Sequence, residues 1–320
     1  MGKCDCKLIL MQIGSPATLS EAAIKTYLYE FLSNKKVVDL PHFIWLPILE
    51  NIILRFRAKK LFKRYEKIWD GQEFLLVKQT RLLCEKIKTE LKSQNIECDY
   101  AFYYGKKTIQ DISLAETSSV VLLPLFPQYS RSTWGILEEL RIEGVQVKWI
   151  SPFYEEDFFI DNVFQKIYKK LVEIETNQTA VEVVLISFHS VPLRQIKKYQ
   201  DPYLIQCEKT FQKLKAKLAK KISCQNIVMC FQSKFGKGRW AKPLLGDLLE
   251  HQFRGKKVVV VSPSFVSDSL ETLVEINEEL RESVEREGGA LYYVDCPNLD
   301  DGWVKGLANF CLKNIKSDMD

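Results

Sequence analysis

The sequence predicts a parallel α/β fold built from two similar halves, on three observations. Short apolar runs bounded by turn residues alternate with longer helical patterns, which is typical of βαβ units. The runs are apolar almost throughout, as expected where helices cover both faces of a sheet. The third observation is a weak internal repeat, because VVLLPLFPQYS (120–130) resembles VVVVSPSFVSD (258–268).

Four strands are expected before Ser151 and four after it, so we predict an N-terminal domain over 1–150 and a C-terminal domain over 151–320. The apolar stretch 8–13 has no cleavage site behind it and indicates a first buried strand rather than a signal peptide. The expected strands are 7–13, 100–104, 120–125, 145–150, 182–188, 227–232, 257–262 and 291–295. Helical patterns between them include 19–32, 74–94, 203–221 and 268–287.

Composition limits the functional classes. The chain has 320 residues, 46% apolar and 27% charged, which excludes disordered and fibrous proteins. A net charge of +5 is too small for a dedicated nucleic-acid binder. The longest apolar run, 43–49, is far shorter than the ~20 residues of a spanning helix. Nine cysteines without C-x-x-C pairs indicate reduced thiols, and therefore a cytoplasmic protein.

Charge is distributed unevenly along the chain. Residues 51–67 carry seven basic side chains and one acidic, whereas residues 271–287 carry seven acidic and two basic. The first patch suits a ligand with carboxylates, and the second suits a divalent metal or protons. The small net charge therefore conceals two oppositely charged regions.

His189 is the strongest candidate for chemistry among three histidines. It directly follows the expected strand 182–188, in SFHSVP. The carboxyl ends of strands form the ligand crevice of open α/β sheets, and imidazole accepts protons near neutral pH. A general base or metal ligand is thus favoured over a structural histidine.

A row of carboxylates follows the strand 257–262. Glu271, Glu275 and Glu279 recur at intervals of four, so they drift slowly around a regular α-helix and would align better on a π-type turn. A solvated acidic face is the alternative for a Glu-rich helix. Glu271 does not fit that alternative, because it lies in the first turn beside the crevice.

Residues 41–69 form an apolar and aromatic stretch that merges into a basic one. This combination suits a flap over a flat apolar ligand with acidic substituents, or contact with a membrane surface. An ordinary amphipathic helix packed on the sheet is equally compatible. The sequence has no nucleophile elbow of a serine hydrolase. It also has no complete glycine-rich loop for binding a dinucleotide, so no nucleotide cofactor is expected.

Several motifs, in order, resemble the ferrochelatase family from the first strand to about Leu307. They are IGSP (13–16), EFLSNKKVVDLP (30–41), YEKIW (65–69), PLFPQYSRST (124–133), SFHSVP (187–192), DPYLIQCE (201–208), FQSKFG (231–236) and FVSDSLETLVEI (265–276). The resemblance implies two flavodoxin-like domains with a porphyrin in the cleft between them. It implies insertion of Fe(II) into that porphyrin near the end of haem synthesis, with iron as substrate and no resident cofactor.

The resemblance also implies roles for individual residues. His189 and Glu271 would be the catalytic and metal-binding pair, with the order in which they meet the metal left open. Glu275, Glu279 and Asp268 would relay protons or metal. The implied porphyrin contacts are Ile13, Arg57, Tyr65, Tyr129, Ser130 and Trp240.

The chain departs from the family pattern at several positions. The positions that anchor porphyrin propionates in the family hold Glu73 and Tyr103 here, while Lys106 and Lys107 replace a polar residue and a proline. Arg57 and the two lysines are expected to compensate. Serines also occupy three unusual positions near the expected site, at 190, 264 and 269.

Two further expectations concern ligands. An aliphatic Ile13 resembles members that act on protoporphyrin IX, whereas those acting on coproporphyrin often carry Tyr there. Cys296 and Cys311 are too few and too far apart for a C-terminal iron–sulfur cluster, so none is expected.

The alternatives are a non-catalytic porphyrin or haem carrier, a coproporphyrin-specific enzyme, a chelatase for cobalt or sirohydrochlorin, and a periplasmic metal receptor. The expected location is the cytoplasm, with or without peripheral contact of the flap with the inner membrane.

Overall fold

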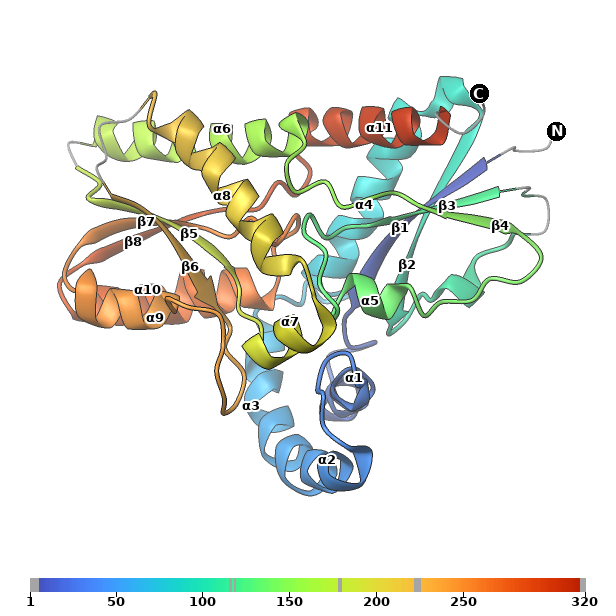
Figure 1. The fold of residues 1–320 in the computed structure, drawn as a ribbon, viewed down its shortest axis with the longest axis horizontal. Helices are drawn as coiled ribbons and strands as arrows, with labels where there is room; N and C mark the ends of the chain where they lie inside the picture. The colour runs from blue at the N-terminus through green and yellow to red at the C-terminus, as the bar shows by residue number, and fades with distance from the viewer. Residues whose placement is uncertain (1–5, 115–116, 118, 178–179, 222–225, 317–320) are drawn as a thin grey trace. The chain divides into compact units, whose positions relative to one another are not determined.

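The computed structural model describes residues 6–114, 117, 119–177, 180–221 and 226–316, and contains two four-stranded parallel sheets (Figure 1). All eight predicted strands are present, and the largest difference in bounds is the earlier start of β2. The strands are β1 (Cys6–Gly14), β2 (Ile96–Tyr104), β3 (Ser119–Pro124), β4 (Gln146–Trp149), β5 (Val183–His189), β6 (Asn226–Gln232), β7 (Lys257–Val261) and β8 (Ala290–Val294).

The two sheets share one topology. The first has the order β2-β1-β3-β4 and the second β6-β5-β7-β8, with every neighbouring pair parallel. In each sheet the strand that comes first in the sequence of its unit therefore occupies the second position. This is the strand order of flavodoxin without the fifth strand. The predicted α/β class with two similar parallel sheets is confirmed.

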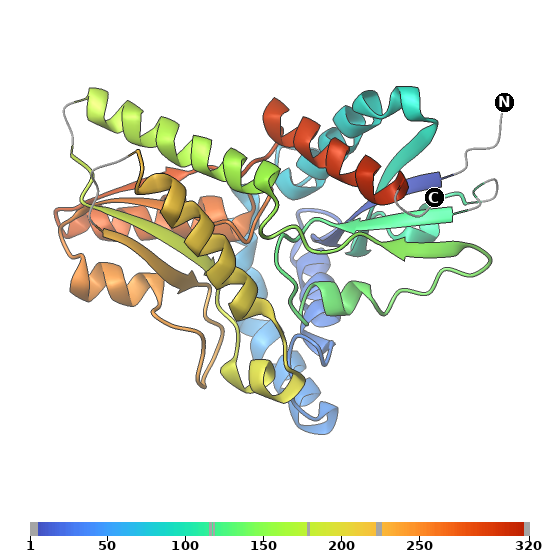
Figure 2. The ribbon, with the colours of Figure 1, turned by 45° about the horizontal axis from the view of Figure 1, so that its top comes forward.

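Helices cover both faces of the first sheet because its strands are apolar on both sides. Tyr27 of α1 and Ile136 of α5 pack with Ile9 and Val120 on one face, and α4 with α11 covers the other (Figure 2). Ser20 caps α1, accepting a hydrogen bond from the Ala23 amide. The helices of this unit are α1 (Glu21–Ser33), α2 (His42–Ile48), α3 (Leu54–Glu66), α4 (Leu75–Glu90), α5 (Trp134–Leu137) and α11 (Asp301–Lys316), with a π-helical turn η1 (Leu49–Ile53) and 3₁₀ turns η2 (Lys92–Gln94) and η3 (Ile109–Asp111).

Two glycines allow the ends of β1 and β2 to approach closely. A Cβ at Gly14 would lie 1.9 Å from the carbonyl oxygen of Tyr104, and one at Gly105 would lie 2.4 Å from that of Ser15. Both glycines also have φ above +100°, which other residues rarely adopt. Glycine is therefore required at both positions.

The second sheet is covered by α6 and α8 on one face and by α9 and α10 on the other (Figure 1). Its apolar core joins Val258 and Val260 of β7 to Ile276 and Val284 of the acidic helical segment. The helices are α6 (Asp157–Thr176), α7 (Leu193–Tyr199), α8 (Tyr203–Leu218), α9 (Leu245–Asp247) and α10 (Arg281–Arg286), with π-helical segments η4 (Leu248–Gln252) and η5 (Leu270–Leu280).

The chain divides into two compact units. Residues 1–126, 130–152 and 299–320 form the N-terminal unit, and residues 127–129 and 153–298 form the C-terminal unit. This division differs from the predicted 151–320 domain at its end, because α11 packs along α4 and so belongs to the N-terminal unit. Sequence order alone gave no sign of this return of the chain. No helix among the described residues is long and apolar enough to cross a membrane.

Candidate active site

The ends of three neighbouring strands meet in the C-terminal unit. His189 ends β5 and lies opposite Gln232, which ends β6, while Ser262 follows β7. The buried Gln232 side chain accepts a hydrogen bond from Ser262 Oγ (2.8 Å) and donates one to the backbone carbonyl of Glu271 (3.1 Å). One glutamine thus ties the sheet to η5. It was not singled out from the sequence, where a polar residue ending an apolar strand was its only signal.

His189 is partly buried, and its ring is held by its own backbone. Nδ1 lies 2.8 Å from the carbonyl oxygen of Ser190, an acceptor that requires the proton on Nδ1 and leaves Nε2 as the basic atom of the neutral ring. Burial lowers the pKa of His189, and the Glu271 carboxylate and the Ser190 carbonyl offset part of this effect. A neutral imidazole ready to accept a proton follows from these contacts.

Glu271 is positioned by the residue that caps its helix. Ser269 Oγ donates a hydrogen bond of 2.8 Å to Glu271 Oε2, and the Ser269 amide donates to Thr272 Oγ1 at 2.9 Å. Ser269 therefore fixes both the start of η5 and the carboxylate nearest to it. The segment Leu270–Leu280 is π-helical, the geometry in which the carboxylates at intervals of four align better than on a regular α-helix. Such geometry is rare and is often found at functional sites.

Glu275 follows one helical turn later. Ser233 Oγ lies 2.9 and 3.0 Å from its two carboxylate oxygens, so one hydroxyl is shared between them. Ser233 directly follows β6 and has φ of +60°, an uncommon conformation for a residue with a side chain. Glu279 lies on the same π-helix and is partly buried. The three predicted carboxylates therefore share one π-helix, and the first two are anchored by serines.

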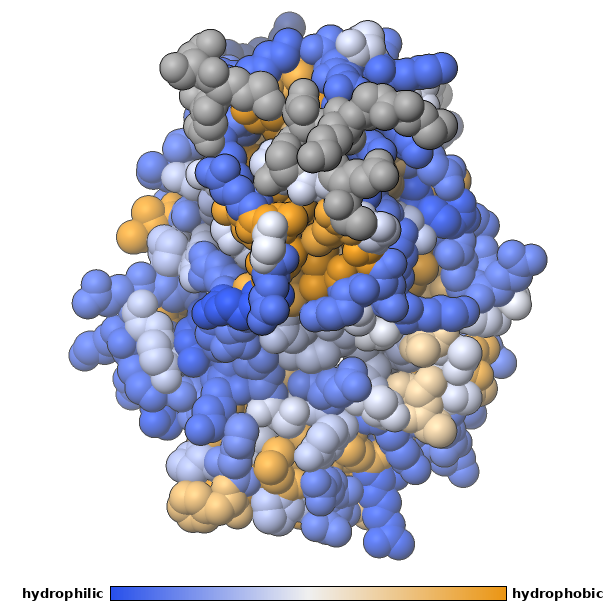
Figure 3. Space-filling view, turned by 90° about the vertical axis from the view of Figure 1, so that its right-hand side faces the viewer, coloured by the Kyte–Doolittle hydropathy of each residue, from blue (hydrophilic) through white to orange (hydrophobic). Residues whose placement is uncertain are grey.

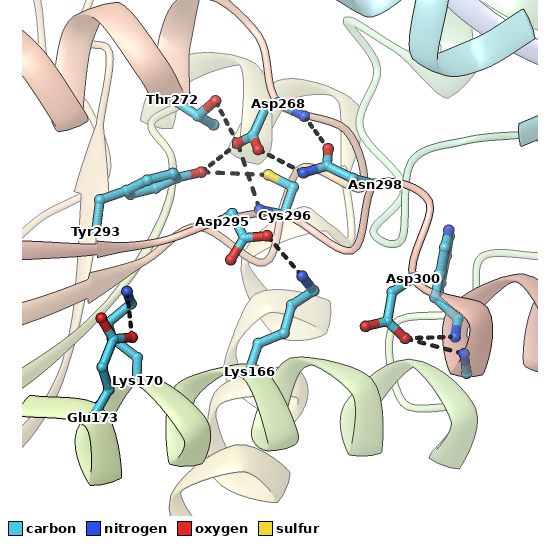
Figure 4. Close-up of polar contacts among 12 residues, drawn as sticks. Lys166, Lys170, Glu173, Asp268, Thr272, Tyr293, Asp295, Cys296, Asn298 and Asp300 are labelled. Atoms are coloured by element: carbon cyan, nitrogen blue, oxygen red, sulfur yellow. Dashed lines mark hydrogen bonds and ion pairs between the residues drawn. The ribbon is translucent and has the colours of Figure 1, made fainter. Parts of the chain in front are cut away.

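Asp268 is buried in a network just before η5 (Figure 4). Its Oδ1 accepts hydrogen bonds from the hydroxyls of Tyr293 (2.7 Å) and Thr272 (3.0 Å) and from the Cys296 amide (3.4 Å), while Oδ2 accepts from Asn298 Nδ2 (2.6 Å). With both oxygens engaged, the carboxylate is suited to holding the start of η5. The predicted relay role of Asp268 stays a prediction.

The unusual serines near His189 are well accommodated. Ser190 is buried and donates to the carbonyl of Ala241 (3.1 Å). Ser264 Oγ contacts the hydroxyl of Tyr203 (2.9 Å) and accepts a hydrogen bond from the His189 amide (3.3 Å). These departures from the family pattern therefore add hydrogen bonds around the imidazole and leave no hydroxyl of the pair unsatisfied.

Two predicted porphyrin contacts also lie in the C-terminal unit. Trp240 forms an antiparallel bridge with Pro192, which places it beside the turn after His189. The Tyr129 amide donates a hydrogen bond of 2.6 Å to Gln206 Oε1 of α8. Trp240 is thus close in the fold to the catalytic candidate.

The other predicted contacts lie in the N-terminal unit. Ile13 is buried in the apolar core beside Tyr104. Tyr65 is buried with its ring edge-on to Phe74, at 5.3 Å between centroids. Arg57 is on the exposed side of α3, and burial of its guanidinium and the nearby Arg64 cation lower its pKa. Ser130 is buried, with its hydroxyl 3.1 Å from that of Ser132.

A pocket of about 400 Å³ lies at the carboxyl ends of β1 and β2 in the same unit. Glu73, Lys106 and Lys107, three of the departures from the family pattern, line it. Arg81 pairs with Glu73 at 2.6 Å and so neutralises that carboxylate. Lys107 pairs with Asp99 at 2.6 Å, outside the lining. The pocket therefore keeps a surplus of positive charge.

No group of three or more His, Cys, Asp and Glu side chains in the described part of the chain is arranged to hold a metal ion. The seven described cysteines are all buried. Burial raises the thiol pKa values of Cys296 and Cys311, which keeps them protonated.

The molecule has paired parallel sheets, and one unit carries an imidazole at a strand end and carboxylates on a π-helix, which is the arrangement of the chelatase fold. A structure of SirB from Bacillus subtilis with Fe3+ superposes with a TM-score of 0.54 and 10% identity over 97% of this chain and 95% of that one. CbiX, the terminal enzyme of sirohaem biosynthesis in denitrifying bacteria, gives 0.53 and 10% over 97% and 98%. At these identities the likeness shows the fold alone.

Sequence comparison identifies the family. The ferrochelatase family profile matches residues 7–315. The Rhizobium etli ferrochelatase is 29% identical, covering 97% of this chain and 93% of the relative, and a Francisella tularensis subsp. holarctica ferrochelatase is 32% identical, covering 96% of each. The chain belongs to the ferrochelatase family, and it is an enzyme that inserts a metal ion into a porphyrin.

Proposed function

We propose that this enzyme inserts Fe(II) into protoporphyrin IX, with His189 and Glu271 as its catalytic pair. The observation that carries the proposal is the His189 imidazole, held through Nδ1 by the Ser190 carbonyl, together with the Glu271 carboxylate that Ser269 holds in place. A base and an anion of this kind can serve both a proton and a divalent metal.

The reaction requires proton acceptors. A free-base porphyrin loses two pyrrole N–H protons as the divalent ion enters, so the metalloporphyrin is neutral at its centre and two protons must leave. His189 Nε2 takes the first proton, because Nδ1 is engaged by the Ser190 carbonyl. Glu271 stabilises the imidazolium that forms, since its charge already favours the protonated ring.

The carboxylates of η5 supply the next steps. Glu271, Glu275 and Glu279 are spaced along one π-helix and lead away from His189, so protons or hydrated metal can pass between them. Ser233 and Ser269 stabilise the charged forms of the first two by hydrogen bonding. Asp268 holds the start of this helix.

We assign porphyrin binding to the predicted contacts Ile13, Arg57, Tyr65, Tyr129, Ser130 and Trp240. In the N-terminal unit, the surplus positive charge of the pocket near Lys106 suits a propionate. Lys106 is exposed, and its side chain makes no hydrogen bond or ion pair with any described residue. In the family, residues at positions 73 and 103 anchor the propionates, and these positions hold Glu73 and Tyr103 here. Lys106 supplies a positive charge for a propionate in their place.

The test is anaerobic mixing of the enzyme with Fe(II), with protoporphyrin IX and coproporphyrin III run in parallel. Insertion changes the visible spectrum of the porphyrin. Faster turnover of protoporphyrin IX supports the proposal, and faster turnover of coproporphyrin III would make the enzyme a coproporphyrin chelatase. Porphyrin binding without insertion above background would establish a carrier instead.

We further propose a cytoplasmic location and no resident cofactor. Six described cysteines, at positions 84, 98, 207, 230, 296 and 311, form no disulfide, which is typical of a reducing compartment. An iron–sulfur cluster needs clustered thiolates, whereas Cys296 and Cys311 are buried thiols in different units. Iron quantification on enzyme purified without added metal tests this proposal, because stoichiometric iron and sulfide would contradict it.

A further inference from the structure

Ser264 and Tyr203 make a hydrogen-bonded contact beside His189 that the proposed mechanism does not use. Ser264 Oγ accepts a hydrogen bond of 3.3 Å from the His189 amide and lies 2.9 Å from the hydroxyl oxygen of Tyr203. All three residues belong to the C-terminal unit. The contact therefore joins the first residue of α8 to the last residue of β5.

The His189 amide needs an acceptor from outside the sheet. The next amide, that of Ser190, donates to the carbonyl of Gln232 in β6 at 2.8 Å. Successive residues of a strand direct their backbone groups to opposite neighbours, so the His189 amide points toward the β7 side. On that side the ladder between β5 and β7 has already ended at Val261. Ser264 therefore supplies the acceptor that the sheet no longer offers, and an amide left unpaired in the interior would cost free energy.

The backbone at His189 in turn orients its ring. Nδ1 is hydrogen-bonded to the carbonyl oxygen of Ser190, so the direction of the imidazole depends on the backbone conformation of these two residues. The ring also faces Phe265, with the two centroids 6.3 Å apart and the planes at 60°. Residues 264 and 265 therefore lie against both the amide and the ring of His189.

Tyr203 fixes the Ser264 hydroxyl and is itself fixed at the start of α8. The Tyr203 amide donates a hydrogen bond of 2.9 Å to Asp201 Oδ1. Burial raises the pKa of Tyr203, so its hydroxyl keeps its proton. Ser264 Oγ is thus held between the start of a helix and the end of a strand.

Both hydroxyls of this contact are buried. Hydrophilic residues predominate on the face of the molecule that Figure 3 shows, where water can satisfy their polar groups. Ser264 is only 9% exposed and Tyr203 only 4%, so their hydroxyls need partners inside the protein. A hydrogen bond that is shielded from water is electrostatically stronger than an exposed one. The contact is therefore suited to fixing the geometry of its neighbours.

We propose that Ser264 and Tyr203 are positioning residues for metal insertion, which hold His189 in the orientation in which Nε2 accepts a pyrrole proton. The inference rests on the proposed catalytic role of His189. A general base has to lie within hydrogen-bond reach of the proton that it abstracts, and a small displacement slows the reaction. Loosening the end of β5 should therefore slow the chemical step and leave porphyrin binding unchanged. Serine at position 264 departs from the family pattern, so this support is a feature of the present chain.

The experiment combines amide hydrogen exchange with kinetics on the full chain. Isotopic labelling of histidine alone gives three backbone amide signals. In Ser264→Ala the His189 amide loses its acceptor, and its exchange should become at least about tenfold faster. The amides of His42 and His251 should exchange as in the wild type. In Zn(II) insertion, Ser264→Ala should lower kcat about three- to tenfold with KM for protoporphyrin IX unchanged.

Three further variants separate the hydroxyl contact from general structural damage. Ser264→Thr keeps a hydroxyl and should retain the slow exchange and most of the kcat. Tyr203→Phe keeps the ring, and the double variant Ser264→Ala/Tyr203→Phe should be no slower than Ser264→Ala, because the two hydroxyls act through one contact. Tyr168→Phe is the matched control, since it removes a tyrosine hydroxyl from α6 of the same unit and should leave kcat unchanged.

Thermal unfolding midpoints establish that each variant is folded. The inference is overturned if His189→Ala is inactive while folded Ser264→Ala keeps the wild-type kcat, or if the His189 amide exchanges equally fast in both proteins. A rise in KM with constant kcat would also overturn it, because the contact would then serve porphyrin binding. A wild-type rate in His189→Ala would overturn the proposed function, and this inference with it.

Discussion

The two units of this enzyme share a strand order but differ in what their strand ends present. In the C-terminal unit the ends of β5 and β6 carry His189 and Ser233. At the corresponding ends of β1 and β2, the N-terminal unit has Gly14 and Gly105, whose lack of side chains lets the backbones approach. One topology therefore presents polar side chains, the proposed proton-handling site, in one unit. In the other unit it presents strand ends without side chains, beside a basic pocket. Function here depends on the residues grafted at the strand ends rather than on the fold.

The largest expected effect is that of His189→Ala. If chemistry resides in the C-terminal unit, loss of the imidazole should slow metal insertion by about 10²–10⁴-fold. His251 provides a control, because it is exposed in η4 and His251→Ala should insert metal at the wild-type rate. The measurement is the initial rate of Zn(II) insertion followed by fluorescence. An unchanged rate in His189→Ala would contradict the role assigned to this residue.

Glu271→Gln should slow insertion by about 10²-fold and also change the titration of His189. Burial already lowers the pKa of His189, and Glu271 opposes that effect. Removing the negative charge should therefore lower the pKa further, so that the imidazole becomes protonated only at a more acidic pH. NMR titration is practical because the chain has three histidines. A pKa that stays constant or rises would show that Glu271 does not act on the ring.

Asp268→Ala tests the support of η5. It removes the acceptor of the buried Tyr293 hydroxyl, of Asn298 Nδ2 and of the Cys296 amide, and we expect a loss of about 3 kcal/mol in the free energy of unfolding. Asp161→Ala is the matched control, since its exposed pair with Lys217 should contribute less than about 1 kcal/mol. Urea unfolding measures both variants. Equal losses would show that the Asp268 network has no special role.

Two substitutions at Ser233 separate its hydroxyl from its backbone. Ser233→Ala and Ser233→Gly both remove the hydrogen bond to Glu275, and each should lower the insertion rate by about three- to tenfold. Glycine tolerates the φ of +60°, so Ser233→Gly should be about 0.5–1 kcal/mol more stable than Ser233→Ala. If only Ser233→Ala loses activity, backbone strain rather than the hydroxyl is the important feature.

The smallest expected effect lies in the N-terminal unit. Lys106→Ala should raise KM for the porphyrin by about two- to fivefold with kcat unchanged, because an exposed charge pair contributes little free energy. Lys92→Ala is the control, since Lys92 is exposed at η2, away from the pocket lining. A fall in kcat with constant KM would place chemistry in the N-terminal unit and break the proposed division of roles.

The sequence by itself determined the class of fold and the family. Apolar runs of strand length, separated by helical patterns, are local signals, because period and turn chemistry are read within a few residues. They located all eight strands, and ordered motifs identified the ferrochelatase family. Local patterns also showed that His189 lies at the end of a strand. They showed as well that Glu271 and Glu275 would align better on a π-type helix.

Only the tertiary structure decided which residues support the site. Ser233, Gln232 and Ser269 act through partners that lie far along the chain or depend on a particular rotamer, and no local pattern encodes such contacts. The four hydrogen bonds that the Asp268 carboxylate accepts likewise come from residues that no local pattern brings together. The return of α11 to the N-terminal unit has the same origin. Local interactions set the elements, while packing between distant segments sets the environment and charge of each side chain.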